Sequence, residues 1–347
     1  MIVGGVLGAL GLAVLVVARA RELRLSALGA TLAGGAILVV TLRPEGNDRL
    51  LLVAGVVGCA AAVGLAALFL RWPWLLPMAA LVCAPARVPV KVGGEEANLL
   101  LPLYVVMVAG TLALGRELLK RNGRARELGP LAWPLAAFLG WAGLSLLWSE
   151  GARQGAVSLA AFYLPFALLA LLLSRLPWSR RWLKALTIQL VAMAGLFAGI
   201  GVYQWVTRDV FWNPKVIVAN AYAPFYRVNS LFWDPSIYGR FLVIAILVAL
   251  VIALYGARRD AIVTALAVVG LWVGLVFSFS QSSFVALMVG VLVAAAFVWR
   301  RRAVLVMGLA VAALVSVGFS APGLREALFE ELRSGVDRAT SGRFDLV

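Results

Sequence analysis

Residues 237–255 read IYGRFLVIAILVALVIALY and contain one charged residue, Arg240. A helix needs about 20 mainly apolar residues to cross the hydrocarbon core of a bilayer, and this stretch meets that requirement. Similar apolar runs continue through almost all of the 347 residues. The sequence therefore predicts an all-α fold, a polytopic integral membrane protein built as a bundle of helices.

The apolar runs predict about twelve transmembrane helices. They lie near residues 2–18, 26–42, 50–70, 72–87, 98–115, 130–148, 155–174, 184–206, 237–255, 261–279, 283–299 and 303–320. The fourth run contains four prolines, which break or kink a helix interior. The alternative for residues 72–87 is a re-entrant or broken helix, and a re-entrant helix would leave eleven crossings.

The composition excludes a water-soluble domain. Apolar residues make up 63% of the chain and charged residues 14%, whereas a soluble domain carries about a quarter charged residues. The net charge of +15 does not indicate a nucleic-acid partner, because Lys and Arg separate the apolar runs instead of gathering on one solvated face. The lipid bilayer is the expected partner.

The residues that most often hold metals or transfer protons are scarce. The chain has no histidine, and Cys59 and Cys83 lie in apolar stretches without ligand spacing. No phosphate-binding loop, dinucleotide fingerprint or metal-ligand cluster is present. We therefore expect no cofactor and no metal.

Lys and Arg are unevenly divided between alternate loops. One set of loops holds 18 of them, and the opposite set, up to residue 236, holds 8. Because cytoplasmic loops carry the excess of Lys and Arg, the first set is predicted to be cytoplasmic. The N-terminus, residues 207–236 and residues 321–347 are then expected on the outer side of the cytoplasmic (inner) membrane.

The outward segment leads into FYRVNSLFWDPSIYGRFL, residues 225–242. Asp234 followed by Pro235 predicts a helix start, with the carboxylate as cap and proline in the first turn. Arg227 precedes this start and Arg240 lies about one and a half turns after it, so the two guanidiniums indicate a site for phosphate oxygens. The alternative is a surface Arg227 and an Arg240 that snorkels to the interface among aromatic residues.

A second polar motif, SFSQSSF at residues 278–284, is predicted to form an outer turn between two spans. No histidine or lysine is placed to activate a serine, so these serines are expected to line a ligand cavity and not to act as nucleophiles. The alternative is that they only hold neighbouring helices together or cap the turn. The residues expected to line a cavity are Asn229, directly after Val228, and Asp234, Ser280, Gln281 and Ser282. Glu95 and Glu96 are expected in a solvated outward loop.

Four motifs occur in a fixed order: LSLLWSE at 144–150, R-x-N-S-x-x-x-D-P-S at 227–236, SFSQSSF, and SGRFDL at 341–346. In order and in placement between spans they resemble the O-antigen ligase and O-antigen polymerase family of bacterial envelope glycan enzymes, over roughly residues 130–347. The resemblance divides the chain into N-terminal transmembrane helices (1–129), a ligase-like core (130–320) and the start of a large outward loop (321–347).

The resemblance implies a metal-independent glycosyltransferase of polysaccharide biosynthesis. Such an enzyme moves a glycan from undecaprenyl diphosphate to a glycan or glycolipid acceptor at the outer membrane face. Arg227 falls where the family has an outward arginine proposed to hold the diphosphate, and Arg343 matches a further arginine. Gln281 replaces an arginine common in the family, and we expect Arg240 to take over its role.

The family's proposed general base is a histidine located further along the large outward loop. No catalytic residue is therefore expected within residues 1–347, and the chain is expected to be a fragment. A multi-span transporter or a flippase for lipid-linked glycans is the alternative function. About twelve spans with a charged residue inside one of them are equally typical of secondary carriers.

Overall fold

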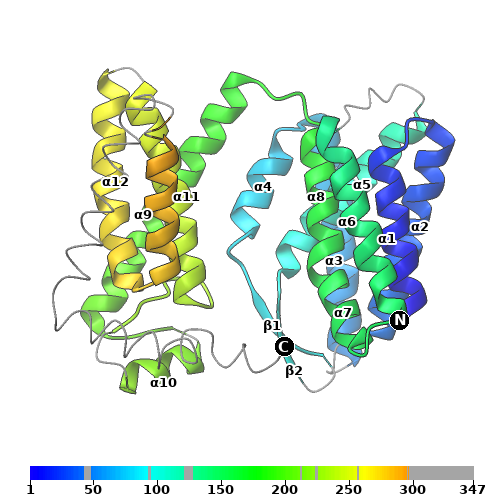
Figure 1. Ribbon diagram of the computed structural model, residues 1–347, viewed down its shortest axis with the longest axis horizontal. Helices are drawn as coiled ribbons and strands as arrows, with labels where there is room; N and C mark the ends of the chain where they lie inside the picture. The colour runs from blue at the N-terminus through cyan, green and yellow to red at the C-terminus, as the bar shows by residue number, and fades with distance from the viewer. Residues whose placement is uncertain are drawn as a thin grey trace.

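The computed structural model describes residues 1–42, 48–92, 95–120, 128–211, 213–222, 226–255, 258–294 and 296. This part of the chain is mainly helical, with one two-stranded antiparallel hairpin (Figure 1). The elements are α1 (Ile2–Val17), α2 (Arg21–Thr41), α3 (Asp48–Arg71), α4 (Leu75–Cys83), β1 (Val88–Val92), β2 (Glu95–Leu99), α5 (Leu101–Leu119), η1 (Gly129–Leu131), α6 (Ala132–Leu144), η2 (Ser145–Leu147), α7 (Ala152–Ser158), η3 (Leu159–Tyr163), α8 (Leu164–Ser174), α9 (Arg180–Thr207), α10 (Pro214–Tyr222), α11 (Pro235–Tyr255), α12 (Arg258–Ser278) and a helix at Gln281–Ala294.

Among the described residues, six helical stretches are long and apolar enough to cross a membrane. They are Arg21–Thr41, Leu101–Leu119, Gly129–Leu147, Ala152–Ser174, Arg180–Thr207 and Pro235–Ala253. Large apolar side chains cover the outside of the helices, as at Trp133 (73% exposed) and Leu266 (69% exposed), and a continuous surface of this kind suits lipid and not water. The prediction of a helical membrane protein is confirmed at this level. The predicted span at 303–320 lies outside the described residues.

The fourth apolar run forms a broken helix. The helix α4 has nine residues, about 14 Å, which is roughly half the thickness of the hydrocarbon core. After α4 the chain continues into β1, which pairs with β2 so that Lys91 lies opposite Glu96. Glu95 and Glu96 were expected in a loop, and that prediction was wrong, because they begin β2. The prolines account for the short helix, since Pro85 follows its end and Pro89 lies within β1.

The first unit consists of α1 to α8, whose buried side chains form one apolar core. Small residues allow α1 and α2 to approach each other closely. A Cβ atom built on Gly34 would lie 2.2 Å from the backbone nitrogen of Gly8, so no side chain fits there. Contacts between small residues are the usual way that helices pack in membranes, where apolar side chains gain little from leaving lipid.

The second unit consists of α9, α11, α12 and Gln281–Ala294, around a core that includes Phe197, Tyr238 and Leu275. Figure 1 shows these helices beside the first unit, with α4 and α9 at the boundary. At this boundary Gln189 Nε2 of α9 donates a hydrogen bond to the carbonyl of Met78 in α4 (2.9 Å). The boundary between the two packed units therefore lies between α8 and α9. The domain boundary expected from the family resemblance lies earlier, at residue 129.

The helices run back and forth between two ends of the molecule. In Figure 1 the N-terminus, the hairpin and α10 lie at the lower end, and the connections α1–α2, α3–α4 and α8–α9 lie at the upper end. These three connections contain or adjoin basic residues such as Arg21, Arg71 and Arg180. Within the described residues, the loops that the sequence grouped as rich in Lys and Arg thus share one end.

Candidate functional site

Residues 226–234 lead from α10 into the second unit and are fixed there by Ser230. The Ser230 N–H donates to Gln204 Oε1 (2.7 Å), its carbonyl accepts from Gln204 Nε2 (3.1 Å), and its Oγ donates to the carbonyl of Phe197 (2.8 Å). Ser230 has a φ of 53°, a left-handed conformation that costs a non-glycine residue roughly 1–2 kcal/mol. The three hydrogen bonds to α9 offset this cost and hold the segment in one conformation.

Arg227 is fixed through both its backbone and its side chain. Asn220 of α10 accepts a hydrogen bond from the Arg227 N–H (3.0 Å) and donates one to its carbonyl (2.8 Å). The Arg227 Nε donates to the carbonyl of Ser278 (3.3 Å), and the adjacent Val228 N–H donates to the carbonyl of Phe277 (3.1 Å). The first and second polar motifs therefore meet at Arg227, which is half-buried and pairs with no carboxylate among the described residues.

The serine turn, residues 278–284, is stabilised largely by its own hydroxyls. Ser278 Oγ donates to a carbonyl of α12 (2.7 Å) and accepts a hydrogen bond from the Ser280 N–H (3.3 Å). The hydroxyls of Ser280 and Ser283 share a hydrogen bond of 2.8 Å. These three serines are buried, whereas Gln281 and Ser282 are exposed. Of the predicted lining residues in this turn, Ser280 supports the turn and the other two face outward.

The start of α11 lies directly on the serine turn. Asp234 Oδ1 accepts a hydrogen bond from the Ser236 N–H (2.7 Å), and α11 begins at Pro235, so the predicted helix start is confirmed. A Cβ atom on Gly239, just over one turn later, would lie 2.6 Å from Ser283 Oγ. The absence of a side chain at Gly239 thus allows the first turns of α11 to contact the serine turn.

Other predicted site residues lie apart from this contact. Asn229 is fully buried; its Nδ2 donates to the carbonyl of Phe232 (2.7 Å), and its Oδ1 has no hydrogen-bond partner among the described residues. Arg240 is exposed and lies about 100° around α11 from Gly239, off the face that meets the serine turn. Within the described residues, no hydrogen bond joins Arg240 to that turn. Arg343 lies outside the described residues.

Arg208, which the sequence analysis did not single out, lies close to this site. It ends α9 with a φ of 58°, and its guanidinium lies 4.7 Å from the ring centre of Trp205 and 5.0 Å from that of Tyr226. Burial raises the pKa of the Tyr226 hydroxyl, and Asp209 adds to the rise, while Arg208 and a hydrogen bond oppose it. The density of aromatic residues around Arg208 in the sequence is the signal for such cation–π contacts.

This arrangement supplies donors for an anion. The Arg227 guanidinium lies against the serine turn, on which the N-terminal turns of α11 rest. Guanidinium groups and helix N-termini bind phosphate oxygens without a metal. In the described part of the chain, no three His, Cys, Asp or Glu side chains come together as a metal site.

Comparisons with known proteins add no relative. No protein-family model, no curated protein and no solved structure matches this chain.

Proposed function

We propose that this protein transfers a glycan from undecaprenyl diphosphate to an acceptor sugar at the outer face of the cytoplasmic membrane, as O-antigen ligases and polymerases do. The observation that carries the proposal is the hydrogen bond from Arg227 to the carbonyl of Ser278. It joins the two motifs that resemble that family, although about fifty residues and two helices, α11 and α12, separate them in the chain. In this proposal Arg227 binds the donor's diphosphate.

The chemistry of the donor supports an arginine at this position. When the glycan leaves, negative charge develops on the diphosphate, and fixed donors that stabilise this charge lower the barrier. A guanidinium offers a planar pair of donors that matches two phosphate oxygens. Because Arg227 is half-buried, its attraction to an anion is screened less than that of a fully solvated side chain. Arg240 and Arg343 are proposed as further diphosphate contacts.

We infer that the whole chain crosses the membrane about twelve times, with α4 and β1 together making the fourth crossing. The N-terminus, the 207–236 segment and residues 321–347 are then outside, because the loops at the other end carry the excess of Lys and Arg. This orientation puts Arg227 at the outer interface. A lipid diphosphate whose polyprenyl tail lies along the helices has its charged group at that depth.

The removal of a proton from the acceptor hydroxyl is not assigned to a described residue. Asp234 is the nearest carboxylate in sequence, but its Oδ1 already accepts the Ser236 N–H as a helix cap. We therefore assign Asp234 to the structure of the site. Holding the donor is the function that we assign to the described residues.

Transport or flipping of a lipid-linked glycan is the second candidate. It is favoured by α4, because secondary carriers bind their substrates at helices that are interrupted within the membrane and α4 ends after nine residues. Reconstituted vesicles with a fluorescent lipid diphosphate distinguish the two functions. A flippase moves the lipid between leaflets without an acceptor, whereas a transferase gives product only when the acceptor is added.

Transfer is tested with the full-length protein, a polyprenyl diphosphate glycan donor and an acceptor glycan. Arg227→Ala should lower the rate by about 30-fold to 1000-fold, the effect of removing about 2–4 kcal/mol of charge stabilisation. Arg227→Lys should recover part of the rate, because it keeps the charge and loses the paired donors. Arg153→Ala is the matched control, since Arg153 is exposed on α7 at the same end of the other unit. Equal rates for Arg227→Ala and wild type would contradict the proposal.

A further inference from the structure

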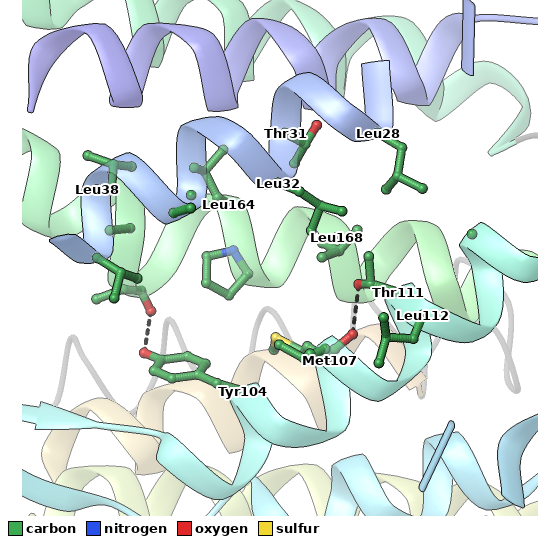
Figure 2. Close-up of a pocket in the computed structure, with 18 of the residues that line it drawn as sticks. Leu28, Thr31, Leu32, Leu38, Tyr104, Met107, Thr111, Leu112, Leu164 and Leu168 are labelled. Atoms are coloured by element: carbon green, nitrogen blue, oxygen red, sulfur yellow. Dashed lines mark hydrogen bonds between the residues drawn. The ribbon is translucent and has the colours of Figure 1, made fainter. Parts of the chain in front are cut away.

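The first unit contains a long groove that the proposed transfer reaction does not use. It has a volume of about 760 Å³ and lies between α2, α5 and the helical stretch from α7 to α8. Figure 2 shows its walls, with side chains from α2, α5 and α8 directed into it. None of its lining residues belongs to the second unit, where Arg227 lies.

The walls of the groove present hydrocarbon. Three hydroxyl side chains line it, but each donates its proton to a backbone carbonyl: Thr31 to Ala27 (2.8 Å), Thr111 to Met107 (2.7 Å) and Tyr104 to Ala161 (2.6 Å). The bonds of Thr111 and Tyr104 are drawn in Figure 2. Since no hydroxyl proton remains to be donated, a polar occupant would lose its hydrogen bonds to water without replacement. The groove therefore suits an apolar chain.

The length of the groove matches the depth of the bilayer. Its lining residues on α5 extend from Leu101 to Leu119, about 27 Å along the helix, and the hydrocarbon core is about 30 Å thick. The π-helix η3 forms part of the wall, and Tyr104 donates to a carbonyl within it. Such wide turns inside helices are frequent at functional sites. The acyl chain of a lipid in one leaflet, which covers about half of that thickness, fits within this groove.

One end of the groove is positively charged. Arg116 lines that end and is exposed, and the buried Arg24 lies one turn before the lining residue Leu28. Arg175, directly after α8, has two buried nitrogens, Nε and Nη2, without a hydrogen-bond partner among the described residues. Burial and the charge of Arg24 lower the pKa of Arg175, and Glu117 opposes them. Arg116 thus brings positive charge to this end, and the two Arg175 nitrogens are donors that no described residue uses.

We propose that this groove binds an anionic glycerophospholipid, with an acyl chain along α5 and the phosphate at Arg116 and Arg175. The match of charge supports this occupant, because the apolar walls accommodate the chain and the phosphate oxygens accept hydrogen bonds from the guanidinium groups. The basic end is also the end where the Lys-rich and Arg-rich loops gather. The lipid therefore comes from the cytoplasmic leaflet, where anionic headgroups favour such residues.

The purified full-length protein is exchanged into detergent that contains equal amounts of phosphatidylglycerol, phosphatidylcholine and undecaprenyl phosphate. Native mass spectrometry then measures which lipid the protein retains. Wild type should retain phosphatidylglycerol at least fivefold over each of the others. Arg116→Ala, an exposed substitution, should reduce that preference at least fivefold.

A pair of glycine variants tests the groove itself. Gly35 lines the groove and Gly29 does not, yet both lie on α2 with no atom within 4 Å of a built Cβ. Gly35→Leu should fill the groove and lower retention at least fivefold, while Gly29→Leu should leave it unchanged. Equal retention by Arg116→Ala, by Gly35→Leu and by wild type would overturn the proposal. Equal retention of all three lipids, or a preference for undecaprenyl phosphate, would also overturn it.

Discussion

Gly239 of α11 lies so close to the serine turn that a methyl group in place of its hydrogen would come within 2.6 Å of Ser283 Oγ. The Ser283 hydroxyl is already hydrogen-bonded to Ser280 (2.8 Å). Any side chain at Gly239 must displace that hydroxyl or move α11. The contact between the two motifs of the candidate site therefore depends on this glycine.

Gly239→Ala should destabilise the protein by about 1–3 kcal/mol, the usual cost of overpacking. It should also weaken binding at Arg227, because the serine turn must shift. Gly270→Ala is the matched control, since Gly270 lies in α12 with no atom within 4 Å of a built Cβ. Thermal unfolding of both variants in the same detergent checks the prediction. Equal melting temperatures for the two variants would show that the contact at Gly239 is loose.

Gln204→Ala should release the segment at 226–234. Without Gln204, the N–H and the carbonyl of Ser230 lose their partners in a fully buried position, and each such group costs about 1–3 kcal/mol. Hydrogen–deuterium exchange should show faster exchange across this segment. Gln154→Ala, at an exposed position of α7, is the control and should change nothing. Unchanged protection in Gln204→Ala would mean that other contacts fix the segment.

The path of the chain through α4 and β1 is tested by labelling single cysteines in intact cells, after Cys59 and Cys83 are replaced by alanine. Cysteines introduced at Lys215 and Lys91 should react with an impermeant reagent from outside, and one at Arg71 should not. If residues 72–92 were re-entrant, positions 71 and 91 would lie on the same side of the membrane and would show the same labelling. Labelling at 71 without labelling at 215 would reverse the proposed orientation.

The helical membrane fold was predictable because length and hydropathy indicate a membrane span almost locally, and six of the described helical stretches meet both criteria. The breaks were predictable for the same reason: Asp234 and Pro235 mark the start of α11, and the prolines around α4 mark a short helix. The strands β1 and β2 were not predicted. Glu95 and Glu96 at the start of β2 have weak β propensities, and the strand forms through its pairing with β1.

The site was predictable only in part. Arg227 and the serine turn were recognised separately, but their contact depends on how α11 and α12 pack. The role of Gln204 was not predicted, because a single amide in an apolar helix gives no indication of its partner 26 residues away. The groove between α2, α5 and α8 was also not predicted. It depends on side chains from three helices and on the π-helix η3, which has no clear sequence signal.

Binding of undecaprenyl diphosphate to the full-length protein in nanodiscs tests the central claim most directly. The Arg227→Ala variant should bind about 10-fold to 150-fold more weakly than wild type, as expected for losing a charged hydrogen bond worth about 1.5–3 kcal/mol. Arg227→Lys should lie between the two, and Arg153→Ala should bind like wild type. The same affinity for wild type and Arg227→Ala would contradict the assignment of Arg227 to the diphosphate.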